Sequence, residues 1–174
     1  MLLSFDYGIL NFIHDNLTCR AGDIFFPIFT KLGSFGLLWI IIAAYLIFIK
    51  KDKKYGITVI LALLLSLLIG NIILKNVVAR PRPFDGLEFI NLLIPAPQDF
   101  SFPSGHTMSS FAAAFVLYKR SGRSGALALL TAALMGFSRL YLYVHYPSDV
   151  ICGAVLGILA ANIALFVSNK IYPA

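Results

Sequence analysis

The stretch ITVILALLLSLLIGNIIL, residues 57–74, decides the class of fold. It carries no charged side chain and ends at Lys75. A helix needs about 20 mainly apolar residues to cross the hydrocarbon core of a bilayer. The whole chain is 59% hydrophobic and 13% charged, whereas a soluble domain is about 45–50% apolar and about 25% charged. The sequence therefore predicts an integral membrane protein.

Further apolar runs flank this stretch on both sides. The run at 24–49 is interrupted by Pro27 and Lys31, so only its second part is clean enough to span. We expect one all-α domain over residues 1–174, a polytopic membrane helix bundle of about five to six helices with a helical core at 56–167. The five predicted spans are residues 32–49, 56–74, 104–118, 125–142 and 149–167.

Residues 1–31 are predicted to form an N-terminal helix and a connector. Apolar residues recur at helical spacing over 2–19, with acidic and amide side chains between them, so this helix is amphipathic and too polar to span. Two interpretations stay open: the helix lies in the plane of the membrane interface, or it packs on its neighbours. His14 lies on this helix, and we assign it no catalytic role.

Basic residues lie in short loops between the predicted spans. The net charge of +6 would fit a nucleic-acid binder, but such clusters beside membrane spans mark the cytoplasmic side. The chain also lacks the polar segments with interleaved aromatic and basic residues that bind single strands, so we expect no nucleic-acid partner. The proline-rich loop at 76–103 and the turn at 143–148 then lie together on the outer side. The clusters are Lys50, Lys51, Lys53 and Lys54, and Lys119, Arg120 and Arg123.

Polar residues gather at the predicted outer ends of four helices. Arg139 lies in the apolar stretch LMGFSRLYLYV, where an ionisable side chain is costly unless paired and usually marks a site. His145 and Asp149 are four residues apart, so the carboxylate can hold one imidazole nitrogen and leave the other free. The full set is Lys75, Arg82, Ser104, Gly105, His106, Ser138, Arg139, His145 and Asp149.

Each member also has an ordinary structural explanation. Lys75 and Arg82 taken singly fit interfacial cations with apolar stems. Ser104 fits a helix N-cap. His145 and Asp149 fit a local hydrogen bond without chemistry. The functional interpretation therefore rests on the set.

The combined residue types indicate a particular chemistry. Three cations and a helix N-terminus suit a dianionic tetrahedral group, and Gly105 lets the backbone approach it closely. Two histidines suit group transfer, one attacking and one protonating the leaving oxygen. No cluster of Asp and Glu indicates a divalent metal, and Cys19 and Cys152 have no metal-ligand spacing. The set predicts metal-free phosphoryl transfer through a covalent phosphohistidine, without a cofactor.

Three motifs in this set resemble the signature of the type 2 phosphatidic acid phosphatase (PAP2) superfamily. They are K-x6-RP at Lys75–Pro83, PSGH at Pro103–His106 and SR-x5-H-x3-D at Ser138–Asp149, complete and in the same order. The resemblance implies His145 as the nucleophile on phosphorus, Asp149 as the group that orients it, and His106 as the general acid. It implies that Lys75, Arg82, Ser104 and Arg139 bind phosphoryl oxygens together with the backbone amide of Gly105.

The chain is most similar in kind to the small bacterial membrane branch of that superfamily. The resemblance implies a lipid phosphate as substrate and membrane lipids as the surroundings, in a bacterial cytoplasmic (inner) membrane. The basic loops, placed on the cytoplasmic side, predict that the site faces the extracytoplasmic side. Undecaprenyl diphosphate is the first choice, because that face suits a lipid recycled in the outer leaflet. Phosphatidylglycerophosphate is the runner-up, lipid A phosphate is a further alternative, and the motifs do not separate the three.

Two other function classes make different predictions. A transporter would place ionisable residues near mid-membrane or use discontinuous helices, and the apolar runs at 57–74 and 149–167 contain only a few small or amide polar residues between their ends. A non-enzymatic scaffold would tolerate substitution of both histidines. Nothing in the sequence requires two histidines for scaffolding.

Overall fold

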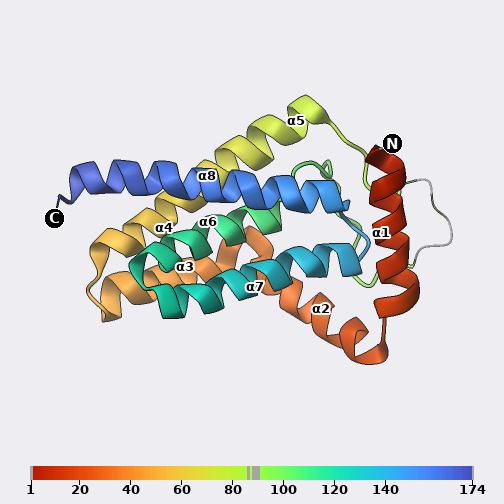
Figure 1. The fold of residues 1–174 in the computed structure, drawn as a ribbon, viewed down its shortest axis with the longest axis horizontal. Helices are drawn as coiled ribbons and strands as arrows, with labels where there is room; N and C mark the ends of the chain where they lie inside the picture. The colour runs from red at the N-terminus through yellow and green to blue at the C-terminus, as the bar shows by residue number, and fades with distance from the viewer. Residues whose placement is uncertain (1, 86, 88–90, 174) are drawn as a thin grey trace.

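The computed structural model describes residues 2–85, 87 and 91–173, and within them the chain is helical (Figure 1). Six helical rods pack into one bundle, as the apolar runs predict, which confirms the all-α class. Two of the rods are built from several segments. The elements are α1 (Leu2–Leu17), α2 (Arg20–Gly33), η1 (Ser34–Gly36), α3 (Leu37–Ala44), η2 (Tyr45–Ile49), α4 (Lys53–Ser66), η3 (Leu67–Leu74), α5 (Lys75–Val78), α6 (Gly105–Arg120), α7 (Gly122–Tyr141) and α8 (Pro147–Ile171).

Four of these rods are long and apolar enough to cross a membrane: Arg20–Ile49, Lys53–Val78, Gly122–Tyr141 and Pro147–Ile171. The fifth predicted span, 104–118, corresponds to α6. With 16 residues α6 is about 24 Å long, less than the roughly 30 Å of a hydrocarbon core. The protein is an integral membrane protein. Its short core helix α6 can be surrounded by the other helices instead of by lipid.

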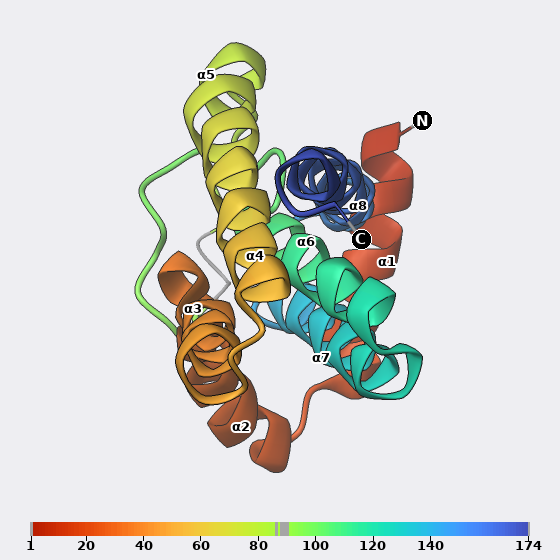
Figure 2. The ribbon, with the colours of Figure 1, turned by 90° about the vertical axis from the view of Figure 1, so that its left-hand side faces the viewer.

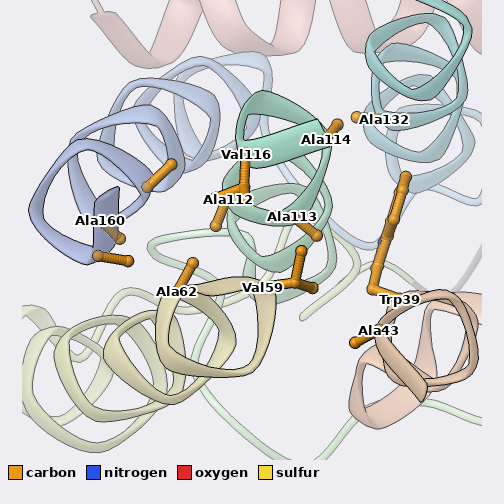
Figure 3. Close-up of a cluster of buried hydrophobic side chains, with 12 residues drawn as sticks. Trp39, Ala43, Val59, Ala62, Ala112, Ala113, Ala114, Val116, Ala132 and Ala160 are labelled. Carbon is orange, nitrogen blue, oxygen red and sulfur yellow. The ribbon is translucent and has the colours of Figure 1, made fainter. Parts of the chain in front are cut away.

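Helix α6 lies in the middle of the bundle (Figure 2). Its alanines point toward α4, α7 and α8, and several buried residues of the same cluster, such as Ala62, Ala132 and Ala160, are also small, with the larger Trp39 of α3 beside them (Figure 3). Small residues let helix backbones approach closely in membrane bundles, where packing rather than water exclusion holds helices together. One polar contact joins α6 to α3, from Trp39 Nε1 to Ser110 Oγ at 3.0 Å. Large apolar side chains such as Ile24, Phe48, Leu130 and Phe166 face outward instead.

The first spanning rod departs from the sequence-based expectation in where it breaks. Pro27 lies inside the continuous helix α2, which already begins at Arg20. The break comes instead at Phe35 and Gly36, whose φ angles are +53° and +68°. Glycine adopts this left-handed conformation without strain, so Gly36 rather than Pro27 allows the rod to change direction.

The two ends of the bundle differ in character. The basic loops and the C-terminus lie at one end, and α1 crosses the other end beside the α7–α8 turn (Figure 1). At the basic end Arg120 pairs with Asp52 at 2.6 Å, and Lys54 Nζ donates to the carbonyl of Tyr172 at 3.0 Å. The loops predicted to share one membrane side therefore do share one end.

Helix α1 lies across one end of the bundle and packs against it. Leu10 and Ile13 are buried against the rest of the protein, as is the carboxylate of Asp6. Phe5 and Phe12 point outward and are more than half exposed. The packed interpretation is therefore confirmed, and the exposed apolar face leaves a place in the membrane interface as a prediction.

The close approach of α8 to α6 gives a test of this packing. A Cβ added at Gly157 would lie 2.3 Å from the carbonyl oxygen of Met108, whereas one added at Gly8 of α1 would meet nothing within 4 Å. We expect Gly157→Ala to destabilise the protein by about 1–3 kcal/mol and to lower its Tm in detergent by several degrees. Gly8→Ala, the control, should leave Tm unchanged or raise it. Equal Tm values for the two variants would contradict the packing described here.

Candidate active site

The end of the bundle that carries α1 collects every residue predicted for the site. Lys75 begins α5, and Arg82 follows in the loop after it. That loop is tied to the segment before α6 by a hydrogen bond from the Ser101 amide to the Arg80 carbonyl at 2.9 Å. The start of α6 is tied to α8 by a bond from the Ser104 amide to the Asp149 carbonyl at 3.1 Å.

His145 lies in the turn between α7 and α8 and is 2% exposed. Its Nδ1 is 3.5 Å from Asp149 Oδ2, and its Nε2 is 3.3 Å from Arg82 Nη1. Because a guanidinium can only donate, Nε2 must accept and the ring proton must sit on Nδ1, facing the carboxylate. Burial, reinforced by the positive charges of Arg82, Arg139 and Lys75, holds the pKa of His145 well below its usual range. The imidazole is therefore neutral at physiological pH, with an Nε2 lone pair on the side of the cations.

Asp149 is fully buried in the first turn of α8. Pro147 precedes it, and Tyr146 is the N-cap in an extended conformation. Asp149 Oδ2 accepts a hydrogen bond from the Tyr146 amide at 2.9 Å. In a capping box, this is the bond from the N-cap backbone to the side chain at the third helical position. Oδ1 accepts a hydrogen bond from Arg80 Nη1 at 2.6 Å. The carboxylate is thus fixed from two directions behind His145.

Arg82 and Lys75 form a cationic pair bridged by a carboxylate. Arg82 is anchored by bonds to the carbonyls of Val144 at 2.6 Å and Asp99 at 2.7 Å. Its Nη2 also donates to Asp99 Oδ1 at 2.6 Å, while Lys75 forms an ion pair with Asp99 Oδ2. Burial would raise the pKa of the Asp99 carboxyl, but Lys75 and Arg82 outweigh it and lower that pKa to about 2.

Arg139 is the least satisfied cation of the site. It is 3% exposed, its Nη1 donates to Thr30 Oγ1, and its Nε has no hydrogen-bond partner within the described part of the chain. It acts electrostatically on Arg82 and His106. A buried guanidinium without a carboxylate partner is costly. Arg139 is therefore placed to bind an anion, which would pair its charge.

The start of α6 agrees with the prediction in position but not in its hydrogen bonds. Ser104 is the N-cap residue, yet its side chain makes no capping bond and pairs instead with Thr107 Oγ1 at 2.8 Å. A Cβ at Gly105 would lie 2.5 Å from Asn71 Oδ1. The glycine therefore makes room for Asn71 of η3, a requirement the sequence did not reveal.

A cavity of about 480 Å³ opens beside these groups. One part of its lining is polar, with Lys75, Asp99 and His106, and the other is apolar, from the α3 and α4 rods. Arg82, Arg139, His145 and Asp149 are not in this lining. Its apolar residues include Ile40, Ile60, Leu63, Leu64 and Leu67.

Comparison with known proteins agrees with this arrangement. The model of the PAP2 superfamily matches residues 55–172. This chain belongs to the PAP2 superfamily. It is 36% identical over 121 residues to the undecaprenyl-diphosphatase of Sulfolobus acidocaldarius, covering 69% of this chain but only 58% of that relative's length.

Two solved structures share the fold. The crystal structure of LpxE from Aquifex aeolicus is 35% identical with a TM-score of 0.80, covering 93% of this chain and 95% of that one. The transmembrane PAP2 type phosphatidylglycerolphosphate phosphatase of Bacillus subtilis is 27% identical with a TM-score of 0.74, covering 98% and 88%. Both matches include most of the residues that precede the PAP2 region.

The structure adds residues that sequence reasoning missed. Asp99 bridges two site cations, Thr30 holds Arg139, and Arg80 and Asp6 lie behind Asp149. Only Arg80 carried a local signal, since it stands beside Pro81 within the PAP2 motif. Within residues 2–85, 87 and 91–173, no three His, Cys, Asp or Glu side chains are grouped as metal ligands would be.

Asp99 gives a test of the anion site. Its carboxylate competes with any anion for Lys75 and Arg82, so we expect Asp99→Asn to tighten the binding of inorganic phosphate by about 3- to 10-fold, the scale of a partly exposed ion pair. Because the pKa of Asp99 is about 2, this gain should be constant over about pH 5 to 8. Calorimetric titration of the detergent-solubilised protein measures both.

The matched control is Asp15→Asn, which removes an exposed carboxylate on α1. It should leave phosphate binding unchanged. Weaker binding in Asp99→Asn would mean that Asp99 holds the two cations in place instead of competing for them.

Proposed function

We propose that this protein is a metal-independent membrane lipid phosphatase that works through a phosphohistidine, with undecaprenyl diphosphate as its substrate. The observation that carries the proposal is the state of His145. Its imidazole is buried, its Nε2 faces Arg82 at 3.3 Å, and the Asp149 carboxylate lies 3.5 Å from Nδ1. That is the arrangement of an activated nucleophile whose attacking atom meets the groups that bind its target.

The chemistry follows from the positions of the groups. Nε2 of His145 attacks phosphorus, an N–P bond forms, and the bond from phosphorus to the leaving oxygen breaks. His106, in the imidazolium form that the negative charge of the bound phosphoryl group favours, gives its proton to that oxygen, while Asp149 stabilises the positive charge that develops on the ring of His145. His106 then takes a proton from a water molecule that attacks phosphorus. The N–P bond breaks, phosphate leaves and His145 is neutral again.

The cations have distinct parts in this scheme. Lys75 and Arg82 bind phosphoryl oxygens after Asp99 withdraws, and the unsatisfied Nε of Arg139 gains a partner. Ser104 and the Gly105 amide complete the cradle at the N-terminus of α6, where free N–H groups attract anions. Charge stabilisation of this kind is usually the largest contribution to catalysis.

The cavity supports a lipid as the substrate. Its polar part adjoins Lys75 and His106, and its apolar part suits a hydrocarbon chain. The name of the Sulfolobus relative favours undecaprenyl diphosphate. That of the Bacillus subtilis structure favours phosphatidylglycerophosphate as the second candidate.

The placement in the membrane completes the proposal. With the basic loops on the cytoplasmic side, the site faces the extracytoplasmic side of a cytoplasmic membrane. Residues 1–174 act as one domain, with a catalytic core at 56–167 that α1 and the rod Arg20–Ile49 adjoin.

The decisive measurement is phosphate release in detergent with excess chelator. We expect wild type to release phosphate and His145→Ala to lose at least about 1,000-fold in kcat, because the covalent route disappears. His14→Ala, an exposed histidine on α1, is the matched control and should retain activity. Release that survives in His145→Ala would remove His145 as nucleophile, and release abolished by chelator would overturn metal independence.

The substrate assignment has its own test. Undecaprenyl diphosphate should give a higher kcat/KM than phosphatidylglycerophosphate when both are presented in the same detergent. The reverse order would make phosphatidylglycerophosphate the substrate and leave the mechanism intact. Release from neither lipid, with other lipid phosphates also inert, would reject the proposed function.

A further inference from the structure

A chain of charged groups runs from α1 to His145, the proposed nucleophile. The guanidinium of Arg80 donates through Nη1 to Asp149 Oδ1 at 2.6 Å and through Nη2 to Asp6 Oδ2 at 2.7 Å. Asp6 and Asp149 are both fully buried. Asp149 in turn faces Nδ1 of His145 at 3.5 Å. The order of groups is therefore carboxylate, guanidinium, carboxylate, imidazole.

Contacts on several sides hold the guanidinium of Arg80 in one orientation. Its Nη1 also donates to Ser148 Oγ at 2.7 Å, and its guanidinium lies 3.9 Å above the ring centre of Tyr146. The donors of Arg80 bind Asp149, Ser148 and Asp6, behind the imidazole of His145. Arg82, two residues along the same loop, instead approaches Nε2 of His145.

The start of α8 donates hydrogen bonds to Asp6 as well. It accepts the Ser148 amide at 3.0 Å and the Ser148 hydroxyl at 2.6 Å. With the guanidinium of Arg80, the carboxylate of Asp6 thus accepts hydrogen bonds from three donors. The charges of Asp6, Arg80 and Asp149 sum to one negative charge.

That sum matters for the reaction. An arginine paired with Asp149 alone would cancel the field that the carboxylate exerts on His145. The second carboxylate restores a net negative charge behind the ring, where it stabilises the imidazolium that forms as Nε2 attacks. Asp6 also fixes the fork of Arg80, which keeps Asp149 aimed at Nδ1.

We propose that Asp6 and Arg80 are positioning residues of the active site, and that α1 is part of the catalytic machinery through them. This inference rests on the proposed function of His145. The alternative is that the same ion pairs only dock α1 on the bundle. Docking has other support, since Tyr143 Oη donates to Asn11 Oδ1 at 2.6 Å and the hydroxyls of Tyr7 and Tyr146 are 3.1 Å apart.

The titration of His145 separates the two roles. The acid limb of kcat/KM reports the protonation of the nucleophile in the free enzyme. Removing the negative charge of Asp6 disfavours the imidazolium and should move this limb to lower pH. Removing the positive charge of Arg80 should move it to higher pH. Each shift should be about 0.5–1 pH unit for a charge one side chain behind the ring.

Other groups near the pair are common to all variants, so the comparison between variants cancels their effect. The titratable and charged groups acting on His145 on the side away from Asp149 are Lys75, Arg82, Asp99, Arg139 and the imidazole of His106. The groups beside Asp149 are Asp6 and Tyr7 from α1, Arg80 and Ser101 from the loops, His145 and Tyr146 from the turn, and Cys152 from α8.

The experiment measures phosphate release from undecaprenyl diphosphate across pH for Asp6→Asn, Arg80→Gln, Arg80→Lys and the α1 control Asp15→Asn. We expect Asp6→Asn and Arg80→Gln to lower kcat by about 10- to 100-fold, on the scale of the loss when the hydrogen-bond partner of a metal-bound histidine is removed. KM should change less than twofold, and the two acid limbs should move in opposite directions. Arg80→Lys should return the limb to its wild-type position because it keeps the charge, with only part of kcat restored because the fork is lost.

Three results would overturn the inference while leaving the proposed function standing: acid limbs that stay in place, limbs that move the same way in Asp6→Asn and Arg80→Gln, or a loss confined to Tm. If Asp6→Asn does not fold, the inference is tested by comparing Arg80→Gln with Arg80→Lys. The quantity compared is the position of the acid limb of kcat/KM. An inactive wild type on every lipid phosphate would reject the proposed function and this inference with it. A Tm scan of each variant accompanies the kinetics.

Discussion

The carboxylate of Asp149 is the interaction on which the geometry of the site depends. Its two oxygens take the amide of Tyr146 and the guanidinium of Arg80, and its own carbonyl takes the amide of Ser104. These bonds join the first turn of α8, the loop after α5 and the N-terminus of α6. A buried ionised carboxylate is stable only with such donors around it. The need to satisfy one charge therefore brings three separate segments to a common point beside His145.

The second constraint is the balance of charge around that point. Arg80 is matched by two carboxylates, Asp6 and Asp149. On the cavity side Lys75, Arg82 and Arg139 face a single carboxylate, that of Asp99. The front of His145 therefore carries an excess of two positive charges, and its back carries one negative charge. A dianionic phosphoryl group meets the front, and the cation created on the ring by its transfer meets the back.

The parts of this site that were predictable are those with local signals. His145 and Asp149 are four residues apart, and Ser104 to His106 open a helix, so their spacing alone brings each group to a helix end. Asp6 and Asp99 carry no such signal. Asp6 pairs with a residue 74 positions away, and on a helix whose outer face is apolar it reads as one more polar residue.

The fold shows the same division between local and long-range information. The long apolar runs predicted the four membrane-capable rods, because a bilayer imposes length and composition directly on the sequence. Helix α6 was counted with them on its apolarity. Its alanines, however, contact protein on every side, and hydropathy does not distinguish a helix surrounded by helices from one surrounded by lipid. The break at Phe35 and Gly36 was hidden for a related reason, since Pro27 is the stronger helix breaker by type but lies where the helix tolerates it.

The shortness of α6 connects the fold to the chemistry. Helix α6 has 16 residues, whereas the rods Lys53–Val78 and Pro147–Ile171 beside it have 26 and 25. The start of α6 lies against the first turn of α8, where Ser104 bonds to the Asp149 carbonyl, and against Asn71 of η3, so its N-terminus and His106 are enclosed between the longer rods beside the cavity. Charges in such a recess are shielded from bulk water and act more strongly on one another than exposed charges do. We infer that the alanine-rich core has a double effect: small side chains let α6 fit in the centre of the bundle, and its central position keeps the anion cradle in a low-dielectric environment next to the apolar cavity.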